Sequence, residues 1–206
     1  MNNYILETED YIFRPVTMED AEFIVKLRNL PHTKGFIHNT STAVELQRKW
    51  ISDYLVRDNE YYWIIEDKNK NRVGTTSFYN YDAEKNQIES GRWIKLPGTG
   101  NGSMSGAILF KDFAFNVLNL SRVVCDTVIT NKQVIKYHHF LGEVEIGRRT
   151  EVGADDTESY DIVCFEETAE RWPENRRKLI KFSGEESDRK VFRIEPNGSL
   201  TEMKLH

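Results

Sequence analysis

Cysteine is scarce in this chain of 206 residues, which has only two. Two cysteines cannot build the disulfide framework of a small secreted domain, and together with the scattered histidines they show no metal-ligand spacing. Cys125 and Cys164 each lie inside an apolar, strand-like segment. We therefore expect two buried free thiols and no metal site.

Long hydrophobic runs are also missing, as is an excess of basic residues. The N-terminal segment 1–15 has neither the basic start nor the apolar core of a signal peptide, and no segment has the pattern of a transmembrane helix. Lys and Arg number 28 against 33 Asp and Glu, a net charge of −5, which argues against a general nucleic-acid-binding protein. These absences predict a cytoplasmic protein with neither a membrane nor a nucleic acid as partner.

The length and the hydrophobic pattern predict one main domain of strands and helices, residues 1–182. Apolar segments with strand character lie at 11–16, 60–67, 72–82, 87–96, 122–130, 143–152 and 158–167. Helical spacing is found at 17–29, 41–58, 103–119, 131–142 and 168–182. Thr17 and either Ser41 or Thr42 are the expected N-caps of the first two helices. Residues 183–206 predict an appended β-hairpin that turns at Asn197–Gly198.

A glycine-rich loop joins the expected strand 87–96 to the expected helix 103–119, with glycines at positions 98, 100, 102 and 106. A helix N-terminus presents unpaired N–H groups and the positive end of the helix dipole, so phosphates bind there when no side chain blocks them. Glycine gives that access. The loop lacks the Gly-Lys-Ser/Thr of a P-loop, and it does not open a parallel unit as in a Rossmann fold. It therefore indicates either a phosphate cradle or a plain flexible connection.

Three segments resemble the GCN5-related N-acetyltransferase (GNAT) superfamily. "TGNGSM" (99–104) stands where the family shows Gln/Arg-x-x-Gly-x-Gly/Ala. "FAFNVLNLSRVVCDTVITN" (113–131) is similar to the Phe-x-x-Leu-x-Leu-x-(Arg/Lys)-(Val/Ile) run of its ribosomal-protein and polyamine branches. "NKQVIKYHHFLG" (131–142) parallels an Asn-x-x-Ala-x-x-x-Tyr-x-x-x-Gly helix. The resemblance runs from Tyr11 to Phe165 in the element order of the family.

The resemblance implies an α+β fold in three layers (α/β/α). Its mixed, mostly antiparallel, twisted central sheet would be of the acyl-CoA N-acyltransferase type, with a V-shaped splay between the fourth and fifth expected strands. It implies acetyl-CoA as co-substrate and no metal. The pyrophosphate would lie on the loop, and the pantetheine arm would add like a strand at the splay, where a backbone bulge would aim N–H groups at the thioester oxygen. The implied contacts are Trp93, Ile94, Lys95, Leu96, Thr99, Gly100, Asn101, Gly102, Ser103, Met104, Asn131 and Val134.

Direct transfer of acetyl to an amine needs a base for the amine proton and a donor for the departing thiolate. The base candidates are Glu89, on the strand before the loop, and Asp126, an isolated charge in an apolar strand. Either could instead be a paired structural residue, Glu89 with Arg92. His138 holds the position of the family's tyrosine and is the expected acid, with the adjacent Tyr137 as the alternative.

Four residues depart from the family pattern. Thr99 stands where Gln or Arg is usual, and Met104 replaces the last small residue of the loop. His138 replaces the tyrosine, and Glu143 replaces the aromatic residue that follows the glycine.

The expected acceptor is an amine, and its class is inferred from the segment that would cover the site and from a resemblance to one branch of the family. The segment after the helix 17–29 would cover the acceptor site, and it has no cluster of carboxylates for a polyamine. Sugar-nucleotide acetyltransferases are resembled by three segments, "LRN" (27–29), "ESGRWI" (89–94) and "NKQVIKYHHFLG" (131–142). The expected acceptor is therefore the amino group of a nucleotide-linked amino sugar. A protein N-terminus, a polyamine and a non-catalytic acetyl-CoA-binding domain remain alternatives. The C-terminal hairpin suggests a homodimer. The expected substrate contacts are Arg28, Asn29, Phe36 and Arg92.

Overall fold

The computed structural model describes residues 2–37, 40–100, 103–152, 159–183 and 189–205. Its strands are β1 (Tyr4–Glu7), β2 (Tyr11–Pro15), β3 (Tyr61–Asp67), β4 (Arg72–Asp82), β5 (Gln87–Lys95), β6 (Arg122–Val128), β7 (Val144–Val152), β8 (Ser159–Thr168), β9 (Lys190–Ile194) and β10 (Leu200–Met203). Its α-helices are α1 (Ala21–Arg28), α2 (Val44–Tyr54), α3 (Ser103–Asp112), α4 (Lys132–Phe140) and α5 (Trp172–Ser183). None of these helices combines the length and the apolar character needed to cross a membrane.

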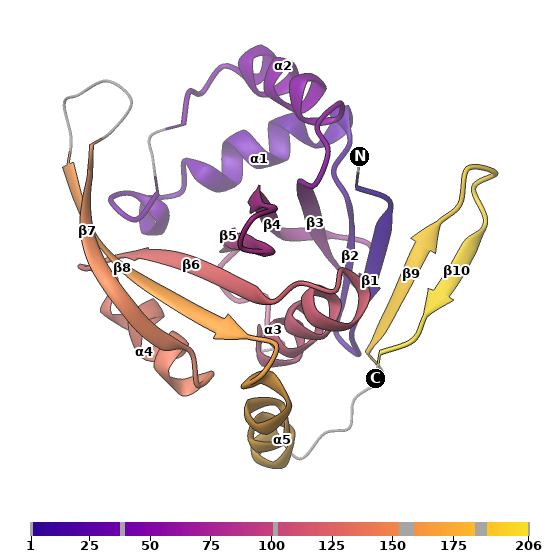
Figure 1. The fold of residues 1–206 in the computed structure, drawn as a ribbon. Coiled ribbons are helices and arrows are strands. Elements are labelled where there is room, and N and C mark those ends of the chain that lie inside the picture. The colour runs from indigo at the N-terminus through magenta and orange to yellow at the C-terminus, as the bar shows by residue number, and fades with distance from the viewer. Residues whose placement is uncertain (1, 38–39, 101–102, 153–158, 184–188, 206) are drawn as a thin grey trace.

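All the strands form one twisted sheet in the order β10-β9-β1-β2-β3-β4-β5-β6-β8-β7 (Figure 1). Each neighbouring pair is antiparallel except β5 and β6, which are parallel. The mixed, mostly antiparallel sheet predicted above is therefore confirmed. The C-terminal hairpin joins this sheet, because β9 pairs with β1.

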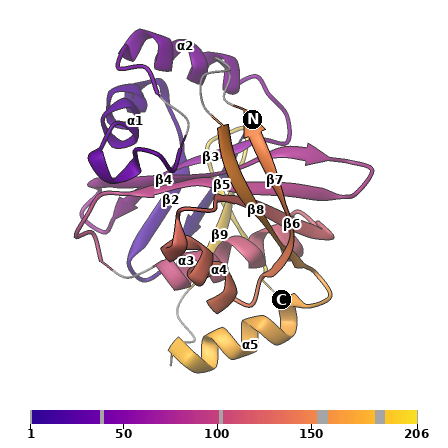
Figure 2. The ribbon, with the colours of Figure 1, turned by 90° about the vertical axis from the view of Figure 1, so that its left-hand side faces the viewer.

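Helices cover both faces of the sheet, α1 and α2 on one and α3, α4 and α5 on the other (Figures 1 and 2). Alternation along β3 shows how the sequence specifies these layers. Tyr62 and Ile64 pack under α1 and α2, whereas Trp63 and Ile65 belong to the larger core beneath α3. The α/β/α layering is thus confirmed, and the two faces are called here the α1–α2 face and the α3–α4 face.

The parallel pairing of β5 and β6 covers only the first three residues of each strand, Gln87–Glu89 and Arg122–Val124. Among the described residues, the ladder between them ends there, and the strands diverge. This is the V-shaped splay between the fourth and fifth expected strands. It leaves the facing backbone edges of Ser90–Lys95 and Cys125–Val128 free for another extended chain.

Three local features differ from the sequence-based expectations. The strand β1 is too short to be recognised from its pattern alone. The helix α2 begins at Val44 with Ala43 as N-cap, and the Ser41 hydroxyl instead accepts from the N–H of Ala43 at 3.1 Å. After Asp112 the helix α3 widens into a π-helical turn, with the N–H of Leu118 bonded to the carbonyl of Phe113.

Candidate active site

The end of the β5–β6 ladder brings together the side chains singled out for proton transfer. Glu89 points to the α1–α2 face, because its neighbour Ile88 lies in the core under α3. Cys125 packs on the α3–α4 face, so Asp126 points the opposite way, to the same face as Glu89. The two base candidates therefore lie on one face of the splay.

The two carboxylates have different partners. Glu89 accepts from the Tyr79 hydroxyl at 2.8 Å and from the Asn80 amide at 2.9 Å. Burial, followed by the charge of Glu89, raises the pKa of Tyr79, which keeps this phenol protonated. Asp126 instead forms an ion pair with Arg149 at 2.6 Å. One carboxylate is thus held by neutral donors and the other by a cation.

A backbone bulge interrupts β5 beside the splay. Ser77 is opposite Gly91 and Thr75 is opposite Ile94, so Arg92 and Trp93 face a single residue of β4. Arg92 has a φ of 54°, in the left-handed region, and its carbonyl accepts from the Thr75 hydroxyl at 3.0 Å. The expected bulge is present; that its N–H groups meet a thioester oxygen remains a prediction.

The side chain of Arg92 lies in an aromatic enclosure on the α1–α2 face, rather than against Glu89. Its guanidinium carbon is 4.2 Å from the ring centroid of Tyr79, 5.2 Å from that of Trp50 and 5.7 Å from that of Tyr62. Cation–π contact of this kind holds the guanidinium over the rings, and its N–H groups point outward in its plane, where Nη1 donates to the Ser77 hydroxyl at 3.5 Å. No sequence pattern predicted the three rings, which come from α2, β3 and β4.

A second guanidinium, that of Arg28 at the end of α1, belongs to the same region. Its Nε donates to the Thr40 hydroxyl at 2.7 Å. Burial lowers the pKa of Arg28, and the positive charge of Arg92 lowers it further. The structure therefore brings together the two arginines expected to contact the substrate.

The other two expected substrate residues have different settings. Asn29 donates its amide to the Val25 carbonyl at 2.9 Å and thereby caps its own helix. Phe36 is 39% exposed, which leaves its ring available at the surface. Neither observation tests a role in acceptor binding.

The glycine loop is fixed to the sheet at its start. Gly98 and Gly100 have φ of 77° and 81°, the left-handed angles that glycine adopts without strain. Lys95 donates to the Tyr11 hydroxyl at 2.6 Å and lies 3.3 Å from the carbonyls of Thr99 and Gly100. The Tyr11 hydroxyl also donates to the Thr99 carbonyl. The described part of the loop is thus anchored to β2 through Tyr11 and to β5 through Lys95.

Several expected cofactor residues take other positions or lie outside the described residues. Asn101 and Gly102 are outside them, as is the side chain of Ser103. Trp93 and Met104 pack with the core under α3, and Ile94 is buried. The N–H of Leu96 bonds to β4. Asn131 is the N-cap of α4 and accepts from the N–H of Val134 at 3.3 Å.

His138 lies on the α3–α4 face, directly beyond the end of the ladder. Its Nε2 is 3.0 Å from the Thr127 hydroxyl and its Nδ1 is 2.6 Å from Glu143. The ring stacks on Phe165 with centroids 4.7 Å apart. Thr127 lies three positions beyond Val124, the last residue of β6 that pairs with β5. Its side chain is on the opposite face from that of Asp126, so His138 and the carboxylates flank the splay from opposite faces.

Tyr137, the alternative acid, turns toward the core beneath α3. Its hydroxyl is buried and has no hydrogen-bonding partner among the described residues. Burial raises the pKa of Tyr137, so the group stays protonated. An orphaned buried hydroxyl of this kind is a place where a bound molecule would supply the missing partner.

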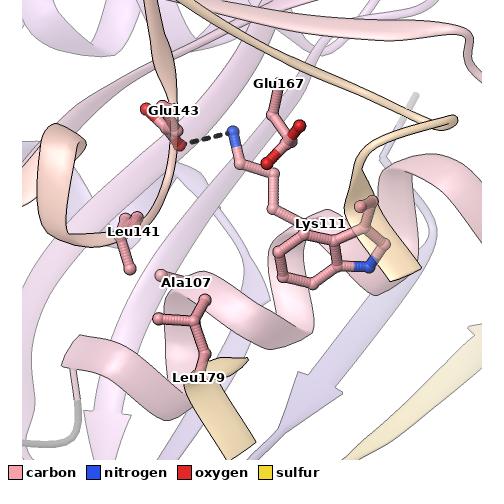
Figure 3. Close-up of a pocket in the computed structure, with 7 residues that line it drawn as sticks. Ala107, Lys111, Leu141, Glu143, Glu167 and Leu179 are labelled. Atoms are coloured by element: carbon pink, nitrogen blue, oxygen red, sulfur yellow. Dashed lines mark ion pairs between the residues drawn. The ribbon is translucent and has the colours of Figure 1, made fainter. Parts of the chain in front are cut away.

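A polar cluster that the sequence did not predict surrounds His138. Cys125, His138 and Glu143 bring metal-ligating atoms within 4.8 Å of one another. Burial raises the pKa of the Cys125 thiol, which keeps it neutral. Lys111 pairs with Glu143 at 2.8 Å beside a small pocket (Figure 3). The expectation of a metal-free protein remains a prediction. Cys125 is a buried free thiol as expected, whereas Cys164 is only half-buried.

Comparison with known proteins agrees with this architecture. Residues 10–142 match the family model of the acetyltransferase (GNAT) domain. The structure is similar to that of FdhC, a nucleotide-linked sugar GNAT, with a TM-score of 0.71 and 23% identity over 88% of this chain and 99% of that chain. It is also similar to a mutant of the spermidine N-acetyltransferase SpeG from Vibrio cholerae, with a TM-score of 0.66 and 18% identity over 79% and 95% of the two chains. No curated protein matches the chain significantly.

The family match covers more than half of the chain, so the chain belongs to the GNAT acetyltransferase family. The class is that of the acetyl-CoA-dependent N-acetyltransferases, as the glycine loop and the α4 helix indicated.

Proposed function

We propose that this enzyme transfers acetyl from acetyl-CoA to the amino group of a nucleotide-linked amino sugar. The observation that carries the proposal is the aromatic enclosure of the Arg92 guanidinium on the α1–α2 face, with the guanidinium of Arg28 in the same region. Guanidinium groups bind phosphate oxygens through two parallel hydrogen bonds, and aromatic faces stack on planar bases. The solved FdhC structure, which is that of a nucleotide-linked sugar GNAT, gives the proposal its precedent.

A polyamine acceptor has less support, although SpeG is a spermidine N-acetyltransferase. Spermidine is a polycation, and two arginines that already repel each other would repel it as well. The two candidate base carboxylates are Glu89 and Asp126, and Asp126 is neutralised by Arg149. Among the described residues, no feature of this region favours a protein N-terminus over a phosphate-bearing acceptor.

The splay and the glycine loop are the proposed place of acetyl-CoA. The free edges of β5 and β6 supply backbone groups for the pantetheine amides, and the start of α3 supplies N–H groups and a positive dipole end for the pyrophosphate. The Lys95 ammonium lies 3.3 Å from the Gly100 carbonyl and thereby anchors the loop that leads to that helix. The buried Tyr137 hydroxyl also supports a place for acetyl-CoA here, because it has no partner among the described residues and can donate to a bound molecule next to α3.

Proton transfer completes the proposed reaction. Glu89 removes the proton of the acceptor amine, directly or through water, because its carboxylate is held by neutral donors whereas Asp126 is bound to a cation. The amine nitrogen forms a bond to the acetyl carbon, the carbon–sulfur bond breaks, and its electron pair leaves with sulfur. His138, on the opposite face of the splay, supplies the proton to that sulfur.

A panel of amines tests the proposal. Thiol release from acetyl-CoA is measured with a nucleoside-diphosphate-linked amino sugar, the same amino sugar without the nucleotide, spermidine, and a peptide with a free N-terminus. We expect a kcat/KM at least tenfold higher for the nucleotide-linked substrate than for the free sugar. Faster turnover of spermidine or of the peptide would contradict the assigned acceptor. Binding of acetyl-CoA without release on any amine would contradict catalysis altogether.

A further inference from the structure

Two departures from the family pattern contact each other in the fold. His138 replaces the tyrosine of α4, and Glu143 replaces the aromatic residue after Gly142. The side chains meet at 2.6 Å between Nδ1 and Oε2. A carboxylate on one imidazole nitrogen fixes the orientation of the ring and stabilises its positive charge. The two substitutions thus form a functional pair rather than two independent losses.

The carboxylate of Glu143 is held in its ionised form by a second contact. Lys111, on α3, lies 2.8 Å from Oε1, and the two side chains are only 8% and 3% exposed (Figure 3). Burial opposes ionisation of Glu143, but the charges of Lys111 and His138 outweigh it and hold the pKa of Glu143 well below its usual range. Lys111 also ties the helix that follows the glycine loop to the turn between α4 and β7.

The other side of the imidazole points to the splay. Nε2 lies 3.0 Å from the hydroxyl of Thr127, on the diverging part of β6. Phe165 covers one face of the ring. Among the described residues, the titratable groups that contact the ring are Glu143, with Lys111 behind it, and the neutral thiol of Cys125, whose Sγ is 3.5 Å from Nδ1. One nitrogen therefore faces a counter-ion and the other faces a hydroxyl that can relay a proton.

We infer that Glu143 and Lys111 are positioning residues that hold His138 as the proton donor for the departing thiolate of coenzyme A, an inference that rests on the proposed function. The Nε2 proton passes to the Thr127 oxygen while the Thr127 hydroxyl proton passes to sulfur, so that the thiolate becomes a thiol. The imidazole is left neutral and regains its proton from solvent before the next turnover. The Glu143–His138 pair thereby replaces the phenol that this family uses.

The first experiment separates positioning from general structure. Glu143→Gln keeps the shape of the side chain but removes its charge, and Glu145→Gln, at an exposed ion pair with Arg148 two residues further on, is the matched control. We expect Glu143→Gln to lower kcat tenfold or more with an unchanged KM for acetyl-CoA. The control should change neither. Lys111→Met combined with Glu143→Gln removes both buried charges and keeps the test valid if Glu143→Gln alone folds poorly.

The second experiment restores the family's residue. In a His138→Tyr background, Glu143→Gln should lower kcat less than twofold, because the carboxylate acts only through the imidazole. An equal loss in both backgrounds would overturn the inference, since it would show a structural role. An unchanged kcat for Glu143→Gln in the parent would overturn it as well.

A measurement without turnover distinguishes this inference from the proposed function. The ring nitrogens of His138, observed by NMR in the ligand-free protein, should report an Nδ1 proton bound to a carboxylate in the parent and lose that signature in Glu143→Gln. If the parent acetylates no amine but shows the signature, the proposed function fails and the pair stands. If the parent turns over and the signature is absent, the pair fails and the proposed function stands.

Discussion

The guanidinium of Arg92 lies over the ring of Tyr79, 4.2 Å from its centroid, and the hydroxyl of that ring donates to Glu89 at 2.8 Å. One aromatic side chain therefore connects the proposed anion-binding group to the proposed base. Under the proposed function, this contact would couple binding of the acceptor's phosphate to removal of its amine proton.

Replacement of Arg92 tests the anion-binding side of this arrangement. Because a hydrogen bond to a charged group contributes about 1.5–3 kcal/mol, Arg92→Ala should raise the KM for the nucleotide-linked acceptor roughly ten- to a hundredfold. The KM for acetyl-CoA should not change. Arg48→Ala, on the exposed side of α2 in an ion pair with Glu45, is the control. An equal rise in KM for the free amino sugar would show that Arg92 does not recognise the phosphate.

The ranking of the two carboxylates can be measured directly. Glu89→Gln should lower kcat by about 10²–10⁴-fold, the usual cost of losing a positioned proton-transfer group. Asp126→Asn should cost much less, because Asp126 is engaged by Arg149. Steady-state kinetics at saturating acetyl-CoA give both values. The opposite order would assign the base to Asp126.

The side chains of the two candidate acids point in different directions, and their roles can be distinguished in the same assay. His138→Phe should reduce turnover at least tenfold, whereas Tyr137→Phe should reduce it much less. His138 points to the splay at Thr127, and the Tyr137 hydroxyl is buried toward α3. If Tyr137→Phe is the more damaging variant, the acid is Tyr137.

The stability of the fold should fall at low pH through Asp20. Burial alone would raise the pKa of Asp20, but hydrogen bonds from Arg14 and from the N–H of Thr17 outweigh it and lower the pKa. The unfolded chain therefore takes up the proton first, and this stabilisation is present above about pH 4 and is lost as the pH falls below it. Asp20→Asn should cost about 2–3 kcal/mol at pH 7.

Denaturant unfolding between pH 7 and pH 3 measures this effect. The difference between the parent and Asp20→Asn should shrink as the pH falls. Asp53→Asn, at an exposed ion pair with Lys49, should remain within about 0.5 kcal/mol of the parent. A difference between the parent and Asp20→Asn that does not depend on pH would contradict the assignment.

Metal removal is expected to leave the enzyme unchanged. The ammonium of Lys111 already pairs with Glu143, and it would repel a divalent cation placed among Cys125, His138 and Glu143. Turnover before and after dialysis against a chelator should agree within error, and elemental analysis should find less than one metal per chain. A loss of rate that zinc restores would assign a metal to the cluster.

The sequence by itself determined the layers of this protein and the class to which it belongs. The continuous apolar segment of β3, which is buried on both sides, and the helical spacing on α1 were sufficient because they reflect which sides of each element are buried. The glycine loop and the α4 segment were sufficient for the family, because their residues are close together in the chain. The sequence did not predict the N-cap of α2 or the π-helical turn after Asp112, because packing rather than local preference sets those boundaries.

Only the tertiary structure decided how the candidate side chains are partnered. Asp126 on β6 and Arg149 on β7 are separated in the sheet by β8, and they meet because the long Arg149 side chain reaches across β8 past Cys164. Arg92 turns to three rings from three elements instead of to Glu89, three residues away in the same strand. Lys111 reaches Glu143 because α3 and α4 cover the same face of the sheet. Such contacts follow from strand order and helix placement, which local sequence does not encode, so the residue types could be read in advance but their partners could not.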